Sequence, residues 1–345
     1  MNGMIYYNPA GKPAGTLWGG RMFDVTALGE LLIDFTSHGI SENGNPLFER
    51  NPGGAPANVL AALSRLGADT AFIGKVGNDQ FGSFLRECLL RNQIDTTGLK
   101  VSDKVNTTLA FVHLTEAGDR SFSFYRNPGA DLMLEPSEIP EDLIAGSGVF
   151  HFGSLSLTDE PARSATLKAL NIARDNGVII SYDPNLRPLL WKSLSDAERE
   201  IRRGLEYADV LKISEEELLF ITKESDLEKG SRVLSDMGVG LMFVTLGPKG
   251  TFFRHGSDTG RLDTYDVKVI DTTGAGDAFL GGVLFMLKGK KRGELAMLGK
   301  DEIERMTDFA NAVGALTTTK KGAIPAVPAM EEVNRCMKDI PKLVK

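Results

Sequence analysis

The stretch DVKVIDTTGAGDAFLGGVLFML, residues 266–287, decides how the rest of the chain is interpreted. Its opening VKVI predicts a strand, and AFLGGVLFML predicts an apolar helix after a glycine-rich turn. Gly274, Ala275 and Gly276 are small enough for their backbone N–H groups to approach an anion. The start of a helix also favours negative charge, so the turn is predicted to be an anion hole.

Asp277 falls in the first turn of that helix, beside the predicted anion hole. A carboxylate is electrostatically unfavourable there unless it accepts a proton. A hydroxyl that attacks a phosphoryl group would supply that proton, which makes Asp277 a candidate general base. The pattern alone is equally compatible with a helix-capping acid and glycines that only form a turn. Both interpretations stay open at this point.

Around this stretch, short apolar segments alternate with helical patterns. Buried strands are predicted at residues 23–35, 70–76, 148–153, 178–183, 209–214 and 241–247. Helices are predicted at residues 56–67, 80–92, 160–177, 195–208 and 227–238. This alternation predicts an α/β fold with a mostly parallel central sheet flanked by helices. Ligands bind such sheets beyond the carboxyl ends of the strands.

Two segments depart from the alternation. Residues 107–126 alternate apolar and polar side chains around the turn EAGD, which is typical of a hairpin, and residues 36–50 lack helical periodicity. We expect a small β-sheet lid, formed by about 36–50 and 105–131, inserted into one α/β domain at 23–340. Two surface loops would be the alternative. Residues 1–22 are expected to be an N-terminal extension and not a signal peptide.

Composition excludes several classes of protein. A net charge of -7 and a pI near 5.3 argue against nucleic-acid binding. No apolar run reaches the roughly 18 residues of a membrane span. Two cysteines in 345 residues fit a reducing compartment, which predicts a cytoplasmic protein. A P-loop, a dinucleotide fingerprint, protein-kinase motifs and zinc or EF-hand motifs are all missing from the sequence.

Two long motifs carry a specific resemblance. DTTGAGDAF (271–279) and GGAPANVLAALSRLGADTAFIGKVGNDQFG (53–82) resemble the two diagnostic motifs of the ribokinase-like (PfkB) carbohydrate kinase family. The similarity extends from about Phe23 to Met337. Within the family, GELLIDF, FYRNPGAD, YDPNLR, ISEEEL, TLGPKGT and TTTKKGAIPAVP look most like the fructokinases. The resemblance implies an ATP-dependent sugar kinase.

The resemblance also implies sugar contacts. These are Asp34, Gly53, Gly54, Asn58, Phe124, Arg126 and Arg187. Phe124 and Arg126 are expected to share one face of a strand under the lid. The alternatives are that the glycines only form a turn, that Asn58 caps a helix and that Arg187 is a solvated surface residue.

Nucleotide and metal positions follow from the same resemblance. Thr245, Gly247 and Gly250 resemble a loop beside the ribose and phosphates, and Asn311 matches an adenine-pocket position. Glu217 resembles a residue linked to Mg²⁺ through water, although Ser214 stands where the family usually has Asn. An acidic helix start would also explain it. A monovalent-cation loop, expected to hold K⁺, matches Asp271, Thr273, Thr317, Lys320, Gly322 and Ala326.

The expected reaction is transfer of phosphate from ATP to O6 of D-fructose. Asp277 would act as general base, and the Gly274–Gly276 amides as the anion hole. The lid would exclude water. Alternative substrates are 2-keto-3-deoxygluconate and ribose. A sugar-sensing protein and a glycoside hydrolase are the alternatives outside the kinases. The lid's open face and its aromatic side chains also predict a lid-to-lid homodimer, as in several relatives. These side chains are Phe111, His113, Phe122 and Phe124.

Overall fold

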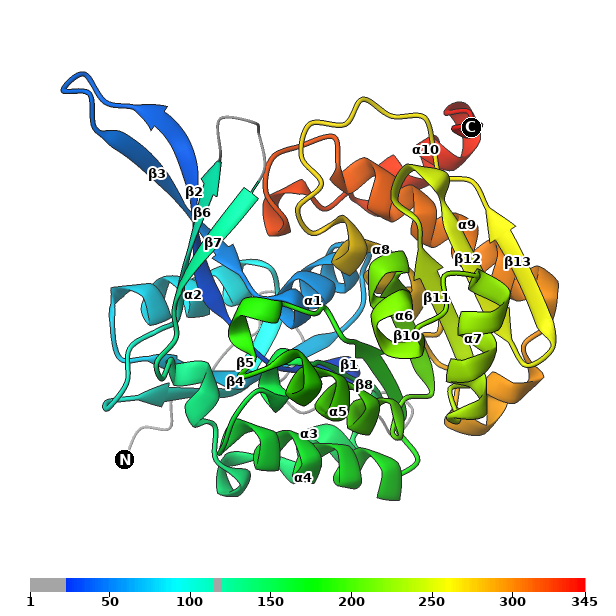
Figure 1. Cartoon of the computed structure of the whole chain (residues 1–345), viewed down its shortest axis with the longest axis horizontal. Coiled ribbons are helices and arrows are strands. Elements are labelled where there is room, and N and C mark those ends of the chain that lie inside the picture. The colour runs from blue at the N-terminus through cyan, green and yellow to red at the C-terminus, as the bar shows by residue number, and fades with distance from the viewer. Residues whose placement is uncertain (1–22, 115–119, 345) are drawn as a thin grey trace, which may run out of the picture.

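Two β-sheets organise the computed structural model, which describes residues 23–114 and 120–344 (Figure 1). The larger sheet has nine strands, in the order β13 (Asp258–Leu262), β12 (Thr251–His255), β11 (Leu241–Thr245), β10 (Val210–Ser214), β9 (Ile179–Asp183), β8 (Ser147–Gly153), β1 (Phe23–Leu28), β4 (Thr70–Gly77) and β5 (Ile94–Ser102). From β11 to β5 all neighbours are parallel, whereas β12 and β13 pair antiparallel. The predicted mostly parallel sheet is confirmed. The sequence patterns had not indicated β5, β12 and β13.

Helices cover both faces of the large sheet. One face packs against α1 (Ala55–Arg65), α2 (Gln80–Arg91), α8 (Ala275–Met286) and α9 (Lys300–Thr317). The other packs against α3 (Glu141–Ala145), α4 (Ala162–Asp175), α5 (Leu194–Leu205), α6 (Glu215–Thr222) and α7 (Leu227–Asp236). The last helix, α10 (Met330–Asp339), packs on α9. Short 3₁₀ helices occupy residues 130–133, 136–138, 155–157, 188–190, 247–249, 292–297 and 324–326.

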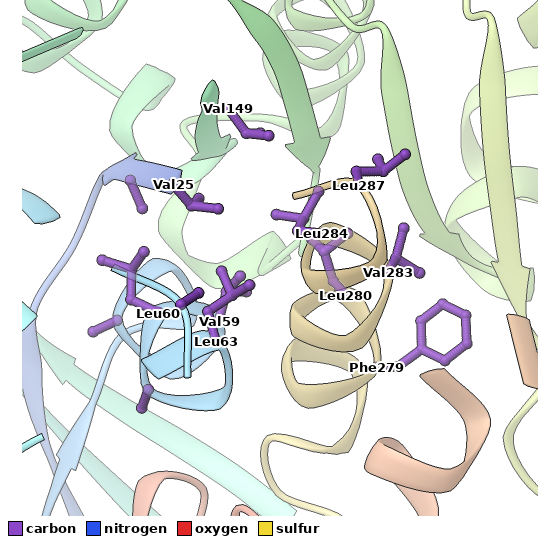
Figure 2. Close-up of a cluster of buried hydrophobic side chains, with 14 of the residues drawn as sticks. Val25, Val59, Leu60, Leu63, Val149, Phe279, Leu280, Val283, Leu284 and Leu287 are labelled. Atoms are coloured by element: carbon purple, nitrogen blue, oxygen red, sulfur yellow. The ribbon is translucent and has the colours of Figure 1, made fainter. Parts of the chain in front are cut away.

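The contact between α1 and α8 is especially close. Figure 2 shows leucine and valine side chains of the two helices meeting beneath strands β1 and β8. A Cβ added at Gly281 of α8 would lie 2.6 Å from the Cβ of Ala62 and 3.2 Å from the carbonyl oxygen of Val59. Only glycine therefore allows this separation between the helices. The packing brings together the N-terminal turns of two helices that are far apart in the sequence.

The second sheet is small and lies to one side of the large one (Figure 1). Its strands, in order, are β3 (Pro46–Gly53), β2 (Leu32–Ile40), β6 (Leu109–Leu114) and β7 (Arg120–Tyr125). β2 pairs antiparallel with β3 and parallel with β6, and β6 pairs antiparallel with β7. The predicted small β-sheet is confirmed. The predicted EAGD turn and residues 1–22 lie outside the described residues.

Two of the predicted strands are wrong in detail. Residues 23–35 form two strands in different sheets, because the chain turns at Gly29–Leu31 between β1 and β2. At that turn the Glu30 carboxylate accepts a hydrogen bond from the Ala55 N–H, 2.9 Å away, which fixes it at the start of α1. Residues 267–270 form no strand. There the Ile270 N–H donates to the Thr318 carbonyl, and Val269 and Ile270 are exposed.

Candidate active site

Asp277 and Asn58 meet where α1 and α8 begin. The Asn58 side-chain amide donates to the Asp277 carboxylate over 2.8 Å, and both side chains are buried, with exposed fractions of 8% and 9%. The other polar atom of Asn58, Oδ1, is buried without a hydrogen-bond partner among the described residues. Buried polar atoms are rarely left unsatisfied, so this oxygen is a candidate acceptor for a ligand hydroxyl.

Burial raises the pKa of Asp277 above its usual range. The Lys212 ammonium, the hydrogen bond from Asn58 and the Arg187 guanidinium oppose that shift, and the Glu217 carboxylate adds to it. A carboxylate shifted toward neutral pH is better suited to accept a proton than an ordinary exposed aspartate. No side chain caps α8, so helix capping does not account for Asp277.

The turn before Asp277 has a left-handed backbone conformation at its first glycine. Gly274, at the N-cap of α8, has a φ of 75°, and a Cβ there would lie 2.5 Å from the Cβ of Ala323. The Ala275 N–H already donates to the Thr272 carbonyl, at 3.2 Å. Among the described residues we find no acceptor for the N–H groups of Gly274 and Gly276. Those two amides are the ones available to an anion.

Asp34 approaches this site from β2 of the small sheet. A Cβ at Gly53 would lie 2.1 Å from Asp34 Oδ2, so glycine is required beside the carboxylate. Gly54 has a φ of 120°, and a Cβ there would lie 2.3 Å from the Glu30 carbonyl oxygen. Burial raises the pKa of Asp34 to about 6, with Arg187 opposing the shift and Asp277 adding to it. The cap of α1 is Gly54, so Asn58 is not a helix cap.

The two predicted arginines differ in their surroundings. Arg187 is exposed, and its charge acts on both Asp34 and Asp277. Arg126 is buried just beyond the end of β7, where its guanidinium forms a 2.6 Å ion pair with Asp131. It also donates to Thr158 Oγ1 and to the Leu155 carbonyl. Arg126 and Phe124 both line a cavity of about 280 Å³, which Trp191 also borders.

Lys212 and Asp183 also belong to this site, and the sequence analysis missed them. Lys212 donates to Asp183 Oδ2 over 2.9 Å, and both side chains are buried. The other Asp183 oxygen has no hydrogen-bond partner among the described residues. One signal in the sequence could have revealed the pair. Lys212 is the charged residue of the apolar strand VLKIS, and a buried charge needs a partner of opposite sign.

Glu217 is buried, and both of its oxygens accept hydrogen bonds. Oε2 accepts from the Ser214 N–H over 2.8 Å, in a capping box of α6, and Oε1 accepts from the Leu186 N–H over 2.6 Å. The second contact ties α6 to the segment that carries Arg187. A carboxylate oxygen has two lone pairs, so each one can still accept from a metal-bound water. The exposed acidic helix start considered above does not describe Glu217.

The predicted nucleotide residues gather around the end of β11 and the start of β12. Thr245 ends β11, and the glycines that follow it have positive φ, 57° at Gly247 and 85° at Gly250. A Cβ at Gly250 would lie 2.0 Å from the Leu262 carbonyl oxygen. The Asn311 amide is buried; it accepts from Thr251 and donates to the Leu262 and Asp263 carbonyls. It therefore supports the wall of this region.

The predicted cation loop consists of two segments held together by Asp271. Its carboxylate accepts from the Thr273 N–H over 3.0 Å and from the Gly322 N–H over 2.9 Å. The other predicted residues have contacts of their own. The Thr317 hydroxyl donates to the Val313 carbonyl, and Lys320 forms an ion pair with Glu332. The backbone N–H of Ala326 donates to the Ala323 carbonyl. Within residues 23–114 and 120–344, no cluster of three or more His, Cys, Asp or Glu could hold a metal ion.

The arrangement as a whole combines a buried carboxylate of raised pKa, two amides without acceptors among the described residues and polar groups with unused acceptors. Those are the elements that phosphoryl transfer to a hydroxyl requires. None of the helices in the described part of the chain is both long and apolar enough to span a bilayer.

The sequence and the fold are similar to those of known carbohydrate kinases. The model of the pfkB family carbohydrate kinases matches residues 22–330. An Arabidopsis thaliana protein named "Probable fructokinase-6, chloroplastic" is 46% identical over 91% of this chain and 82% of its own length. The Xylella fastidiosa fructokinase structure with bound ATP has a TM-score of 0.86 at 33% identity, covering 92% of this chain and 98% of that one.

A further solved structure contains a sugar and a nucleotide. It is a double mutant of the Vibrio cholerae O395 fructokinase, with bound fructose, ADP and a potassium ion. Its TM-score is 0.83 at 35% identity, and the match covers 92% of this chain and 99% of that one. The family model matches most of the chain. The chain in turn covers between 82% and 99% of the length of these three relatives. This chain belongs to the pfkB family of carbohydrate kinases.

Proposed function

We propose that this protein is a fructokinase that transfers the terminal phosphate of ATP to O6 of D-fructose. The observation that carries the proposal is the buried pair of Asn58 and Asp277, which joins the two family motifs at one point. Asn58 Oδ1 and the Asp34 carboxylate are the acceptors we assign to sugar hydroxyls. Gly53 and Gly54 leave the room that the sugar ring needs.

Asp277 is the general base of the proposed mechanism. It accepts the proton of the attacking hydroxyl, and its raised pKa makes it a stronger base than an ordinary aspartate. The N–H groups of Gly274 and Gly276 then stabilise charge on the phosphoryl oxygens, together with the dipole of α8. The small sheet acts as the lid that excludes water, carried by the segments 36–50 and 105–131 of the domain 23–340.

We assign ATP to the end of β11 and the start of β12, beside Thr245, Gly247 and Gly250. Asn311 supports this region from α9. Mg²⁺ reduces the negative charge of the phosphates when it is bound. Glu217 fits a water-mediated role toward it, because its oxygens keep lone pairs and no cluster of acidic ligands lies among the described residues. Such a site agrees with the preference of Mg²⁺ for water and phosphate ligands.

Fructose is favoured over a sugar acid by the state of Arg126. Arg126 and Arg187 together could clamp the carboxylate of a sugar acid, but the Arg126 guanidinium is already neutralised by Asp131. Arg187 alone remains, and it faces two carboxylates, Asp34 and Asp277. A neutral sugar therefore suits the site better than 2-keto-3-deoxygluconate. Ribose is less favoured, because the stretches FYRNPGAD, YDPNLR and TTTKKGAIPAVP look most like those of fructokinases. A sugar sensor would have no use for a buried base beside free amides.

We also propose the cytoplasm as the compartment of the protein. Cys88 and Cys336 are both buried and unpaired, as in proteins kept in a reducing environment. The chloroplastic name of the Arabidopsis thaliana relative provides the competing assignment. Imaging of a fluorescent fusion of the full chain in its native cell would distinguish the two.

The first prediction concerns Asp277. Asp277→Asn keeps the shape and the acceptor for Asn58 but cannot take a proton, so kcat should fall by about 10²–10⁴. The Kd for ATP should change little, because the amides hold the phosphates. In the unchanged protein, kcat should fall as the pH drops through the raised pKa of Asp277, since the protonated form is inactive. Steady-state kinetics and calorimetric ATP binding measure these effects.

Asp209→Asn is the matched control. Asp209 is another largely buried carboxylate, but it accepts hydrogen bonds from the Ile180 N–H of β9 and from the Arg292 side chain of the 292–297 helix. Its removal should lower stability and leave kcat close to that of the unchanged protein. Near-normal kcat in Asp277→Asn would refute the proposed base.

The second prediction concerns the substrate. At saturating MgATP, kcat/KM should be higher for D-fructose than for either ribose or 2-keto-3-deoxygluconate. ADP release measures the rate, and phosphorus NMR identifies the product as fructose 6-phosphate. A tenfold preference for the keto acid, about 1.4 kcal/mol of transition-state free energy, would contradict the fructose assignment. No ADP release with any sugar would contradict the kinase assignment itself.

The third prediction concerns the monovalent cation. K⁺ suits carbonyl oxygens, and Asp271 holds the two segments of the loop together beside the anion hole. The Vibrio cholerae relative carries a potassium ion in its structure. Activity should be higher in K⁺ than in Na⁺ or tetramethylammonium at equal ionic strength, because the ion orders the turn. Equal activity in all three salts would reject the cation site and leave the kinase assignment intact.

The fourth prediction is a homodimer formed through the small sheet. Ile40 and Leu47 expose 72% and 43% of their surfaces, and Phe111 stacks on Phe35 with ring centroids 4.8 Å apart. The side chains of His113 and Phe122, predicted to add to this surface, lie outside the described residues. Light scattering at micromolar concentration should give the mass of a dimer.

The variant Ile40→Glu should give a monomer, because a charge on each copy would be buried in the contact. Met297→Glu is the control: Met297 is 74% exposed but lies in the 292–297 helix, away from the small sheet. It should remain a dimer. A monomer in the unchanged protein would argue against this interface.

A further inference from the structure

Lys212 is a buried cation that the proposed mechanism does not yet use. It lies in β10, and only 7% of its surface is exposed. Its ammonium donates to Asp183 Oδ2 over 2.9 Å, at the end of the neighbouring strand β9. A buried ammonium costs several kcal/mol of desolvation, which one ion pair offsets only in part. This cost invites the question of what else the charge does.

The ammonium also contacts the turn that forms the anion hole. A Cβ added at Gly276 would lie 2.9 Å from Lys212 Nζ and 3.3 Å from its Cε. Gly276 therefore has to be glycine for the lysine to reach this position. The next residue along α8 is Asp277, so the charge of Lys212 lies against the first turn of the helix that carries the proposed base.

Several charged groups act on Asp277, from different elements. Lys212 on β10 and Arg187 after β9 favour its ionised form. The acids that oppose ionisation are Glu217 on α6, Asp183 on β9 and Asp34 on β2. Arg187 is exposed, so water and salt screen its charge, whereas Lys212 is not screened in this way. Lys212 is also the strongest of the influences that lower the pKa of Asp277.

The pair also keeps its own charges. Burial disfavours the ammonium, but Asp183, Glu217 and Asp277 together raise the pKa of Lys212 above its ordinary value. Lys212 is thus a permanent positive charge at neutral pH. Without it, Asp277 would be a buried carboxylate with three other carboxylates nearby and only a screened arginine to offset them.

We propose that Lys212 is a positioning residue of the kinase, which keeps Asp277 ionised and seats the Gly276 turn against the large sheet. The inference rests on the proposed role of Asp277 as base. It differs from two simpler roles for a buried lysine here. A lysine that only joins β9 to β10 would affect stability alone, and a lysine that only binds phosphate would affect ATP affinity alone.

The test is the pH dependence of phosphate transfer in a single turnover, with MgATP and fructose both saturating. Lys212→Met removes the charge and keeps a chain of similar length. The acid limb of its rate profile should move to higher pH by about one unit or more, the size expected when an opposite charge is removed from beside a carboxylate. At alkaline pH much of the rate should return, because Asp277 is then ionised without help.

Lys75→Met is the matched control. Lys75 is a largely buried lysine on another strand, β4, and it pairs with Glu138 over 2.8 Å. Removing it should lower stability by a similar route and leave the acid limb unchanged. If Lys212→Met does not fold, Lys212→Gln retains a donor for Asp183 without the charge, and the same shift is expected.

An acid limb that stays with that of the unchanged protein would overturn the proposal. A lower rate at every pH would then assign Lys212 to the scaffold, and a raised Kd for ATP would assign it to phosphate binding. Failure of the kinase proposal is distinguishable, because the unchanged protein would then transfer no phosphate at any pH.

Discussion

The close packing of α1 against α8 is the constraint on which the site depends. Gly281 allows the helices to approach until a single added carbon would collide with Ala62. At that separation Asn58 and Asp277, 219 residues apart in the sequence, share a hydrogen bond. Each helix also presents its N-terminal amides and dipole at this point. The two long motifs of the sequence therefore act as one site only because the intervening sheet and helices hold these two helix starts together.

Burial gives the site its chemistry, and it has a cost in stability. It raises the pKa of Glu30 to about 7 and that of Asp34 to about 6, against ordinary values of 4.5 and 3.8. A carboxyl whose pKa is raised by folding opposes folding wherever it must be ionised. That penalty is absent below the unfolded pKa and complete above the folded one, so it develops between about pH 4 and pH 7. Lys212 and Arg187 limit the penalty around Asp277, because they favour the ionised form.

The sequence predicted the parallel sheet and the small sheet because hydrophobic periodicity reports directly on burial. It also predicted that a helix follows the glycine turn with Asp277 in its first turn, as α8 confirms. The division of residues 23–35 escaped it, because both halves are apolar and only the contact between Glu30 and Ala55 shows where the chain turns. Residues 267–270 look like a strand but join no sheet, and the Ile270 N–H donates to the Thr318 carbonyl at the end of α9. The partners of Arg126 and Lys212 are tertiary contacts, which no local pattern encodes.

The difference between Arg126 and Arg187 shows why a residue type alone does not determine specificity. Both were candidate sugar contacts, and both carry the same charge. Asp131 neutralises Arg126, whose other N–H groups donate to Thr158 Oγ1 and the Leu155 carbonyl. The charge of Arg126 therefore contributes little to the electrostatic field at the site. Arg187 donates only weakly, to the carbonyls of Asn185 and Leu186, and its charge reaches Asp34 and Asp277. Two cations, Arg187 and Lys212, are outnumbered by four carboxylates, Asp34, Asp183, Glu217 and Asp277, so the local charge balance is negative when all of them are ionised. The carboxylate of a sugar acid would meet repulsion there, whereas a neutral sugar offers hydroxyl donors to the same acceptors.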